Sequence, residues 1–298
     1  MFDIKAIYEA KSLIHASTLL REHPKAYIIA GGSDMLIKIR NGTLAGCELV
    51  DIHSLNEPRN ICILDNGAIK IGALASFKSV STNKILKSAL PVLCDAAASA
   101  GGPQIRAMGT IGGNISNGVT SADTASTLLA FDAELEYTNA EGSRIVPISE
   151  HYISAGKTSL QHDEILSAII IPKSSYEQCH GVYIKYAMRE AMDIAILGCS
   201  VNIKLSKDSK TIERARIAFG VAGPVPVRAK ETEMRLNGSR ADESALEIAA
   251  NAVLKDINAR DSWRASRDFR EHLAQELVRR CLRSAIEHCL NSKLAASA

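Results

Sequence analysis

The sequence predicts an α+β protein built from two domains. A chain of 298 residues with 46% hydrophobic residues is long enough to bury two cores. Strands and helices are mixed in its first part, whereas alternating apolar runs and then helical stretches make up the rest. The runs lie at 183–188, 195–205 and 214–221, and the helical stretches at 227–236, 243–257 and 266–290. Because these elements are segregated along the chain, they predict a three-stranded antiparallel sheet with a helical bundle.

A small βα unit is predicted at the N-terminus. Residues 8–21 have the spacing of an amphipathic helix, which His23-Pro24 ends. A short apolar strand at 26–30 follows, then a helix at 35–39, which Asp34 can cap, and a strand at 48–52.

The next part of the chain predicts short strands and helices before a polar linker. Strands are expected at 61–63, 69–71, 133–137, 144–147 and 164–171, helices at 76–82 and 91–100, and a helical turn at 128–131. The polar stretch 172–180 contains the expected domain boundary. We therefore expect a first domain at 1–175 with subdomains 1–57 and 58–175, a second at 180–292, and a tail at 293–298.

The first candidate binding segment is Ala30-Gly31-Gly32-Ser33-Asp34, directly after the strand that contains Tyr27, Ile28 and Ile29. Two glycines at such a point let the backbone turn tightly and bring its N–H groups close to a ligand. Converging N–H groups favour an anion, best a phosphate or pyrophosphate. For a lone glycine pair, the alternative is an ordinary turn.

A second segment, Gly109-Thr110-Ile111-Gly112-Gly113-Asn114, repeats this composition within a glycine-rich loop. Two such loops can hold one long phosphorylated ligand from two sides. Neither has the G-x-G-x-x-G or the Gly-Lys-Ser/Thr pattern, so the predicted phosphate site is of neither standard type.

Composition argues against several other classes of protein. A net charge of +2 and 4% aromatic residues do not indicate nucleic-acid binding. Seven dispersed cysteines without a C-x-x-C pair predict a reducing, cytoplasmic setting, no metal site and no iron–sulfur cluster on this chain. The N-terminus lacks a signal-peptide pattern, and we expect no membrane span.

The two glycine segments and Gln104-Ile105-Arg106 between them resemble the FAD-binding subunit of the molybdenum hydroxylases. The resemblance runs nearly end to end, and residues 185–189 and 262–266 are most similar to the xanthine dehydrogenase branch. The carbon monoxide dehydrogenase medium chain is also similar. The resemblance implies an FAD-binding domain of the PCMH or vanillyl-alcohol-oxidase-like type, followed by a CO dehydrogenase-type C-terminal domain.

The resemblance also implies which residues bind FAD. The expected set is Tyr27, Ile28, Ile29, Ala30, Gly31, Gly32, Ser33, Asp34, Gly109, Thr110, Ile111, Gly112, Gly113, Asn114, Asp123, Ile165, Leu166 and Lys185. In this reading Lys185 lies beside the flavin ring, where its charge would stabilise the reduced form. Simpler interpretations stay open for four of these residues. Asp123 can be a helix cap and Lys185 a solvated cation, while Ile165 and Leu166 can be core residues.

Other polar residues have more ordinary interpretations. Arg106 is expected to have a structural or interface role. His151, His162 and His180 belong to no recognisable catalytic or metal arrangement and are expected to be surface or core residues. Animal relatives carry an aromatic residue before Gly-Pro-Gln-Ile-Arg, where this sequence has none, so what flanks the flavin ring there stays open.

The implied function is electron transfer inside a complex. Substrate chemistry, the molybdopterin and the [2Fe–2S] clusters would lie on large and small partner subunits, in a heterotrimer or a dimer of heterotrimers. Electrons from purine oxidation would reach this chain's FAD and then NAD, and no catalytic residue is expected here. The alternatives are the FAD subunit of a carbon monoxide, nicotinate or aldehyde dehydrogenase, a stand-alone flavin oxidase, and a phosphate-ligand module without redox chemistry.

Overall fold

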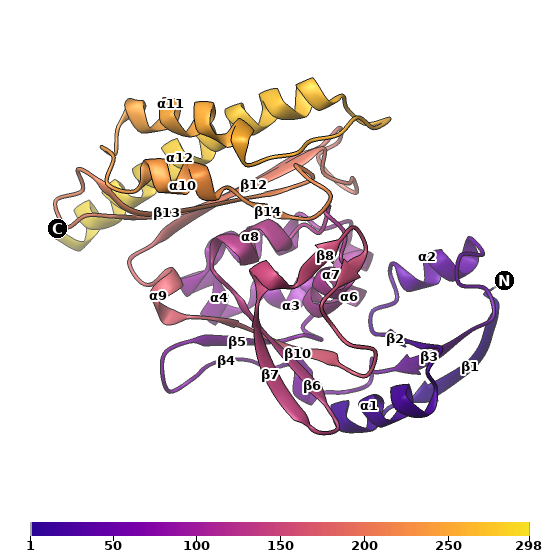
Figure 1. Ribbon diagram of the computed structural model, residues 1–298. Helices are drawn as coiled ribbons and strands as arrows, with labels where there is room; N and C mark the ends of the chain where they lie inside the picture. The colour runs from indigo at the N-terminus through magenta and orange to yellow at the C-terminus, as the bar shows by residue number, and fades with distance from the viewer. Residues whose placement is uncertain (1, 298) are drawn as a thin grey trace.

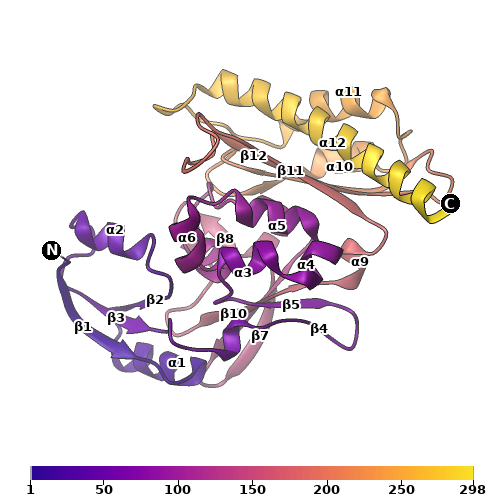
Figure 2. The same cartoon turned by 180° about the vertical axis from the view of Figure 1, so that it is seen from behind.

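The computed structural model describes residues 2–297, with side chains described from residue 2 to residue 292. Figures 1 and 2 show it from opposite sides as a stack of layers. Helices near the C-terminus cover one face of a sheet, whose other face rests on a layer of short helices. A second sheet lies beneath those helices, and the N-terminal elements stand beside it.

The N-terminal unit is a three-stranded parallel sheet with two helices. Its elements are β1 (Ile4–Glu9), α1 (Leu13–Glu22), β2 (Ala26–Ile29), α2 (Met35–Arg40) and β3 (Cys47–Asp51), and the strand order is β1-β3-β2. The helix predicted at 8–21 begins later, because Tyr8 belongs to β1 and Ser12 caps α1 by accepting a hydrogen bond from the His15 N–H.

The middle unit is a five-stranded antiparallel sheet covered by short helices. The strands, in sheet order, are β4 (Ile61–Ile63), β5 (Ile69–Gly72), β10 (Ile165–Ile171), β6 (Glu134–Asn139) and β7 (Gly142–Pro147). The helices are α3 (Phe77–Thr82), α4 (Lys84–Ala89), α5 (Pro91–Ala98), α6 (Pro103–Met108), α7 (Ile111–Ser116) and α8 (Ala125–Ala130). Smaller elements are η1 (Glu57–Arg59), η2 (Ile148–Glu150), β8 (Tyr152–Ser154) and β9 (Lys157–Thr158).

Two predictions for the middle unit were wrong. The stretch expected as a glycine-rich loop contains α7, whose first turn holds both Gly112 and Gly113. Helix α4 was not predicted, although Asn83 caps it by accepting hydrogen bonds from the N–H groups of Ile85 and Leu86.

The C-terminal domain has a four-stranded antiparallel sheet. After α9 (Lys173–Tyr176) its elements are β11 (His180–Tyr186), β12 (Leu197–Leu205), β13 (Ile212–Gly220), β14 (Val227–Arg228), α10 (Lys230–Leu236), α11 (Glu243–Ala252), η3 (Val253–Lys255) and α12 (Arg267–Ser297). The prediction missed β14, which occupies the expected start of a helix. The expected tail at 293–298 is also corrected, because α12 continues to Ser297.

Strand β12 is buried along almost its whole length, which fits its place between two helical layers. Polar contacts join the C-terminal domain to the middle unit as well. Arg228 Nη1 lies 2.7 Å from Asp132 Oδ1 and donates to the Leu129 carbonyl, and its Nε pairs with Glu233. Arg216 Nε lies 2.9 Å from the other oxygen of Asp132. The position of the two domains is therefore fixed by partly buried ion pairs as well as by apolar packing.

Candidate functional site

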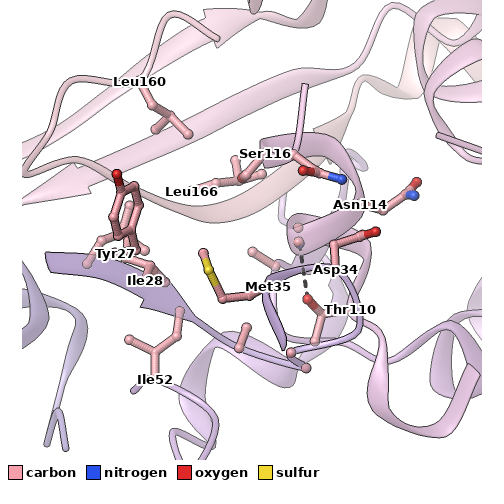
Figure 3. Close-up of a pocket in the computed structure, with 18 of the residues that line it drawn as sticks. Tyr27, Ile28, Asp34, Met35, Ile52, Thr110, Asn114, Ser116, Leu160 and Leu166 are labelled. Atoms are coloured by element: carbon pink, nitrogen blue, oxygen red, sulfur yellow. Dashed lines mark hydrogen bonds between the residues drawn. The ribbon is translucent and has the colours of Figure 1, made fainter. Parts of the chain in front are cut away.

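A cavity of about 420 Å³ lies between the N-terminal unit, α7 and β10. Figure 3 shows that its labelled side chains divide into two groups. Tyr27, Ile28, Ile52 and Leu160 surround an apolar end, while Asp34, Thr110 and Asn114 lie at a polar end. The cavity therefore suits a long ligand with an apolar group at one end and a polar or charged group further along.

The turn between β2 and α2 supplies unpaired backbone donors to this cavity. Gly32 has a φ of +71°, a conformation that favours glycine. A Cβ on Gly31 would lie 2.0 Å from the Met108 carbonyl oxygen, so only glycine permits this close approach. Within the described part of the chain, the N–H groups of residues 31–34 have no hydrogen-bond acceptor. Asp34, expected as a helix cap, makes no capping hydrogen bond and instead lines the cavity.

The second glycine segment has a different role from the one predicted. Its N–H groups already have acceptors: Gly112 donates to the Ala73 carbonyl at 2.8 Å, and Gly113 donates to Thr110 Oγ1 at 3.0 Å. A Cβ on Gly112 would lie 2.5 Å from the Ala73 Cβ, so glycine here lets α7 pack against the backbone after β5. The segment therefore forms a smooth wall with Asn114 and Ser116, opposite the donors of residues 31–34.

Lys38 supplies positive charge at the polar end of the cavity. Its Nζ donates to Asn117 Oδ1 at 2.8 Å and, within the described chain, makes no ion pair. Of the two carboxylates in the lining, Glu164 is already paired with Arg144 at 2.6 Å, and this contact lowers the pKa of Glu164. Lys38 was not predicted as a site residue because it lies one turn beyond the motif, although its spacing of four residues from Asp34 places both on one helix face.

Fourteen of the eighteen residues predicted from the sequence line the cavity. They are Tyr27, Ile28, Ala30, Gly31, Gly32, Ser33, Asp34, Gly109, Thr110, Gly112, Gly113, Asn114, Ile165 and Leu166. Ile29 instead packs beside Ile39 and Leu49, and Ile111 is buried in the middle core. The other lining residues come from segments without a recognisable motif, including Met35, Phe77, Leu160, Gln161 and His162.

Asp123 and Lys185 lie outside this cavity and pair with each other. Their Oδ1 and Nζ atoms are 2.9 Å apart, and Lys185 also donates to the Ser99 carbonyl at 3.0 Å. Burial raises the pKa of Asp123, and the ammonium of Lys185 opposes that rise. Asp123 does not cap α8, and Lys185 is not the solvated cation of the simpler interpretation.

The remaining candidates have structural contacts. Arg106 donates to the carbonyls of Ala100 and Gly101, and His162 Nε2 donates to the Leu20 carbonyl at 3.0 Å. His180 lies within hydrogen-bond distance of Ser292 Oγ. Among the residues with described side chains, no cluster of three or more His, Cys, Asp or Glu side chains is arranged to hold a metal ion. No described helix is both long and apolar enough to cross a membrane.

His151 is fully buried beneath α7 and has a fixed tautomer. Its Nε2 lies 3.1 Å from the Ile115 carbonyl, which can only accept, so Nε2 carries the proton. Nδ1 therefore accepts from the Tyr137 hydroxyl at 2.5 Å, and Tyr137 accepts from Ser159 at 3.0 Å. Burial lowers the pKa of His151 to about 4, so the neutral ring is the form that supports α7.

We expect this histidine to make stability depend on pH. The pKa of His151 falls from its ordinary value of 6.5 to about 4 on folding. Its contribution to the free energy of unfolding is therefore complete above pH 6.5 and declines as the pH falls toward 4. At pH 5 the loss is about 2 kcal/mol. The measurement is the difference in unfolding free energy between the protein and a His151→Gln variant, from pH 7 to pH 5. Parallel pH dependences would contradict the assignment.

Comparison with known proteins gives consistent matches along the chain. Residues 2–174 match the family model described as the FAD binding domain in molybdopterin dehydrogenase, and residues 182–285 match the CO dehydrogenase flavoprotein C-terminal domain. The xanthine dehydrogenase FAD-binding subunit of Escherichia coli is 40% identical, over 96% of this chain and 97% of its own length. The nicotinate dehydrogenase FAD-subunit of Eubacterium barkeri is 30% identical over 88% of each chain. A solved carbon monoxide dehydrogenase structure from Hydrogenophaga pseudoflava has a TM-score of 0.92 at 26% identity, covering 97% of this chain and 99% of that one.

Proposed function

Because the chain belongs to the family of FAD-binding subunits of molybdopterin dehydrogenases, we propose that its cavity holds FAD for electron transfer in a xanthine dehydrogenase. Electrons would arrive from [2Fe–2S] clusters on a small partner subunit, after purine oxidation on a molybdopterin subunit, and would leave to NAD. The 40% identity to the Escherichia coli relative supports this branch of the family. The nicotinate dehydrogenase relative supports the alternative of another hydroxylase in the same family.

The fit of FAD to the cavity rests on one observation above all. The unpaired N–H groups of residues 31–34 face a wall where Gly112 and Gly113 add no side chain and the remaining side chains are small and polar, which suits the diphosphate of a dinucleotide. Tyr27, Ile28 and Leu160 form the apolar end, which would exclude water from a ring system. When bound, FAD supplies the redox chemistry that interconverts single electrons and a hydride.

The resemblance would place Lys185 and Asp123 near the flavin ring, where they would act as a pair beyond the cavity lining. A bare cation would favour the reduced, anionic ring, but Asp123 offsets the charge of Lys185 at 2.9 Å. We propose that the pair orients donor and acceptor atoms toward the ring rather than adding net charge beside it.

Anaerobic spectroscopy of the isolated chain tests the proposed function. We expect yellow protein whose flavin bands are bleached by NADH, because that reaction needs only FAD and a nicotinamide site. Xanthine should leave the flavin oxidised until the molybdopterin and iron–sulfur subunits are added. Bleaching by xanthine alone would make the chain an oxidase, and protein that takes up no FAD would overturn the proposal.

Lys38 provides a separate test of the diphosphate site. A Lys38→Met variant should bind FAD about tenfold more weakly, since it loses one partly screened charge contact to phosphate. Its affinity for riboflavin, which has no phosphate, should not change. The control is Arg40→Met, which removes an exposed cation from the same helix outside the cavity lining. Equal losses for FAD and riboflavin would contradict the assignment.

A further inference from the structure

The side-chain amide of Asn114 has a fixed orientation in the wall of the cavity. Asn114 lies on α7 at the polar end and is half-buried (Figure 3). Its Oδ1 lies 2.7 Å from Thr124 Oγ1 and 3.4 Å from the backbone nitrogen of Thr124. A backbone N–H can only donate, so the amide atom that faces it must be the oxygen. The amide nitrogen, Nδ2, therefore points away from Thr124.

The hydroxyl of Thr124 is committed to this contact. Thr124 is the N-cap residue of α8, a position where a threonine hydroxyl usually accepts a hydrogen bond from a backbone N–H of the first turn. Here the hydroxyl makes no capping bond and donates to Asn114 Oδ1 instead. Thr124 is also 0% exposed, so water cannot take the place of either partner. The orientation of one amide is thus favoured over the ordinary cap of a helix.

The loop that leads to Thr124 is held by the C-terminal domain. Thr120 Oγ1 donates to the Gly223 carbonyl at 2.9 Å, and the Val221 N–H is shared between the Thr120 carbonyl at 3.0 Å and Oγ1 at 3.1 Å. Val221 has a φ of +64°, which a β-branched residue adopts only where its surroundings impose it. The loop between α7 and α8 is therefore fixed from outside the cavity, and so is the position of Thr124.

The free end of the Asn114 amide lies beside the cation of the cavity. Within the described part of the chain, Asn114 Nδ2 has no acceptor, and it is not a buried atom. Asn117 follows three residues later on the same side of α7, and its Oδ1 holds Lys38 Nζ at 2.8 Å. The amide nitrogen and the ammonium thus both offer N–H donors at the polar end. Phosphate oxygens, which only accept, are the ligand atoms that suit such donors.

We propose that Thr124 is a positioning residue, which turns the Asn114 amide so that its N–H groups face a phosphate oxygen of the bound dinucleotide. Thr124 does not touch the ligand itself. With the amide reversed, its carbonyl oxygen would face the phosphate, and two acceptors repel each other. The inference rests on the proposed function, in that the dinucleotide is FAD.

Calorimetric titration of the isolated chain with FAD and with riboflavin tests this role. In Thr124→Val the amide is held only by the 3.4 Å contact, so reversed orientations become populated. The affinity for FAD then falls by the fraction of molecules that keep the N–H groups inward, and we expect a loss of about threefold. The affinity for riboflavin, which has no phosphate, should not change. Thr124→Ser keeps the hydroxyl and should restore the FAD affinity.

Two further variants separate positioning from general stability. Thr127→Val is the matched control, because it removes a hydroxyl of the same size from α8 that is buried without a hydrogen-bond partner. It should leave both affinities unchanged. Asn114→Ala should lower the FAD affinity by about tenfold. In that background Thr124→Val should have no further effect on FAD binding, because Thr124 acts through the amide.

A second measurement needs no substitution at Thr124. The chain is labelled with nitrogen-15 asparagine, and the side-chain NH₂ resonance of Asn114 is identified by its absence from Asn114→Ala. Addition of FAD should shift this resonance, and riboflavin should shift it much less. A resonance that FAD leaves unmoved would show that the amide nitrogen does not face the phosphate.

The outcomes distinguish the two proposals. Unchanged FAD affinity in Thr124→Val, equal losses for FAD and riboflavin, or an effect that persists in the Asn114→Ala background would each overturn the positioning role and leave the proposed function intact. If the unsubstituted chain binds no FAD, the proposed function fails together with the inference that rests on it.

Discussion

A Gly31→Ala variant is expected to fold but to purify with about a tenth or less of the FAD of the unsubstituted protein. The added Cβ would lie 2.0 Å from the Met108 carbonyl oxygen and 2.7 Å from its carbonyl carbon, both backbone atoms. The β2–α2 turn must therefore move away from the corner between α6 and α7. That movement displaces the unpaired N–H groups of residues 31–34 from the opposite wall of the cavity.

The measurement is the ratio of flavin to protein absorbance, with circular dichroism to confirm folding. Gly42→Ala is a matched control, because Gly42 also lies near α2 and an added Cβ there has no atom within 4 Å. Its φ of +82° makes that substitution strained as well, so a general effect of backbone strain would appear in both variants. Full flavin content in Gly31→Ala would exclude the close approach as a requirement for binding.

An Arg228→Met variant is expected to lose about 3–5 kcal/mol of stability. It removes the charge shared by Asp132 and Glu233. The Glu233 carboxylate then stays buried and the Asp132 carboxylate half-exposed, with only Arg216 nearby. It also removes the donor to the Leu129 carbonyl at the end of α8. Because Asp132 belongs to the middle unit and Arg228 to β14, the loss weakens the contact between the two domains.

Differential scanning calorimetry should show a melting temperature lower by about 5–10 °C. The control is Arg235→Met, which breaks an exposed pair with Glu231 on one helix and should cost about 0.5 kcal/mol or less. If the two variants have the same melting temperature, the ion pairs of Arg228 contribute no more to stability than an exposed surface pair does.

Several features could be predicted from the sequence because their causes are local. The strand followed by Gly31-Gly32 is an example, since a positive φ and a close backbone approach both need glycine whatever surrounds them. The family assignment, which was predicted from the two glycine segments, was confirmed by the match of residues 2–174 to the FAD-binding domain model. The positions of the domain boundaries stay a prediction.

Other features depend on contacts that the sequence does not reveal. Gly112 and Gly113 disfavour a helix by their own propensity, yet α7 forms because Gly112 packs directly on Ala73. The pairing of Asp123 with Lys185 joins two domains, so neither sequence neighbourhood could indicate it. That the Gly112 donor is already used follows only from the position of the strand end at Ala73.

The position of the cavity has a thermodynamic consequence. The N-terminal unit is joined to the middle unit by polar contacts of single side chains. They are Arg21 with Asp163 and Glu141, Ser17 Oγ with the Ala140 N–H, Lys38 with Asn117, and His162 with the Leu20 carbonyl. A ligand in the cavity touches both sides of that junction, so its binding energy adds to the energy that keeps the unit in place. By mass action, each tenfold rise of free ligand above its dissociation constant adds about 1.4 kcal/mol to that attachment. The supply of flavin would thus determine how often the first strands of the protein detach and become open to proteases.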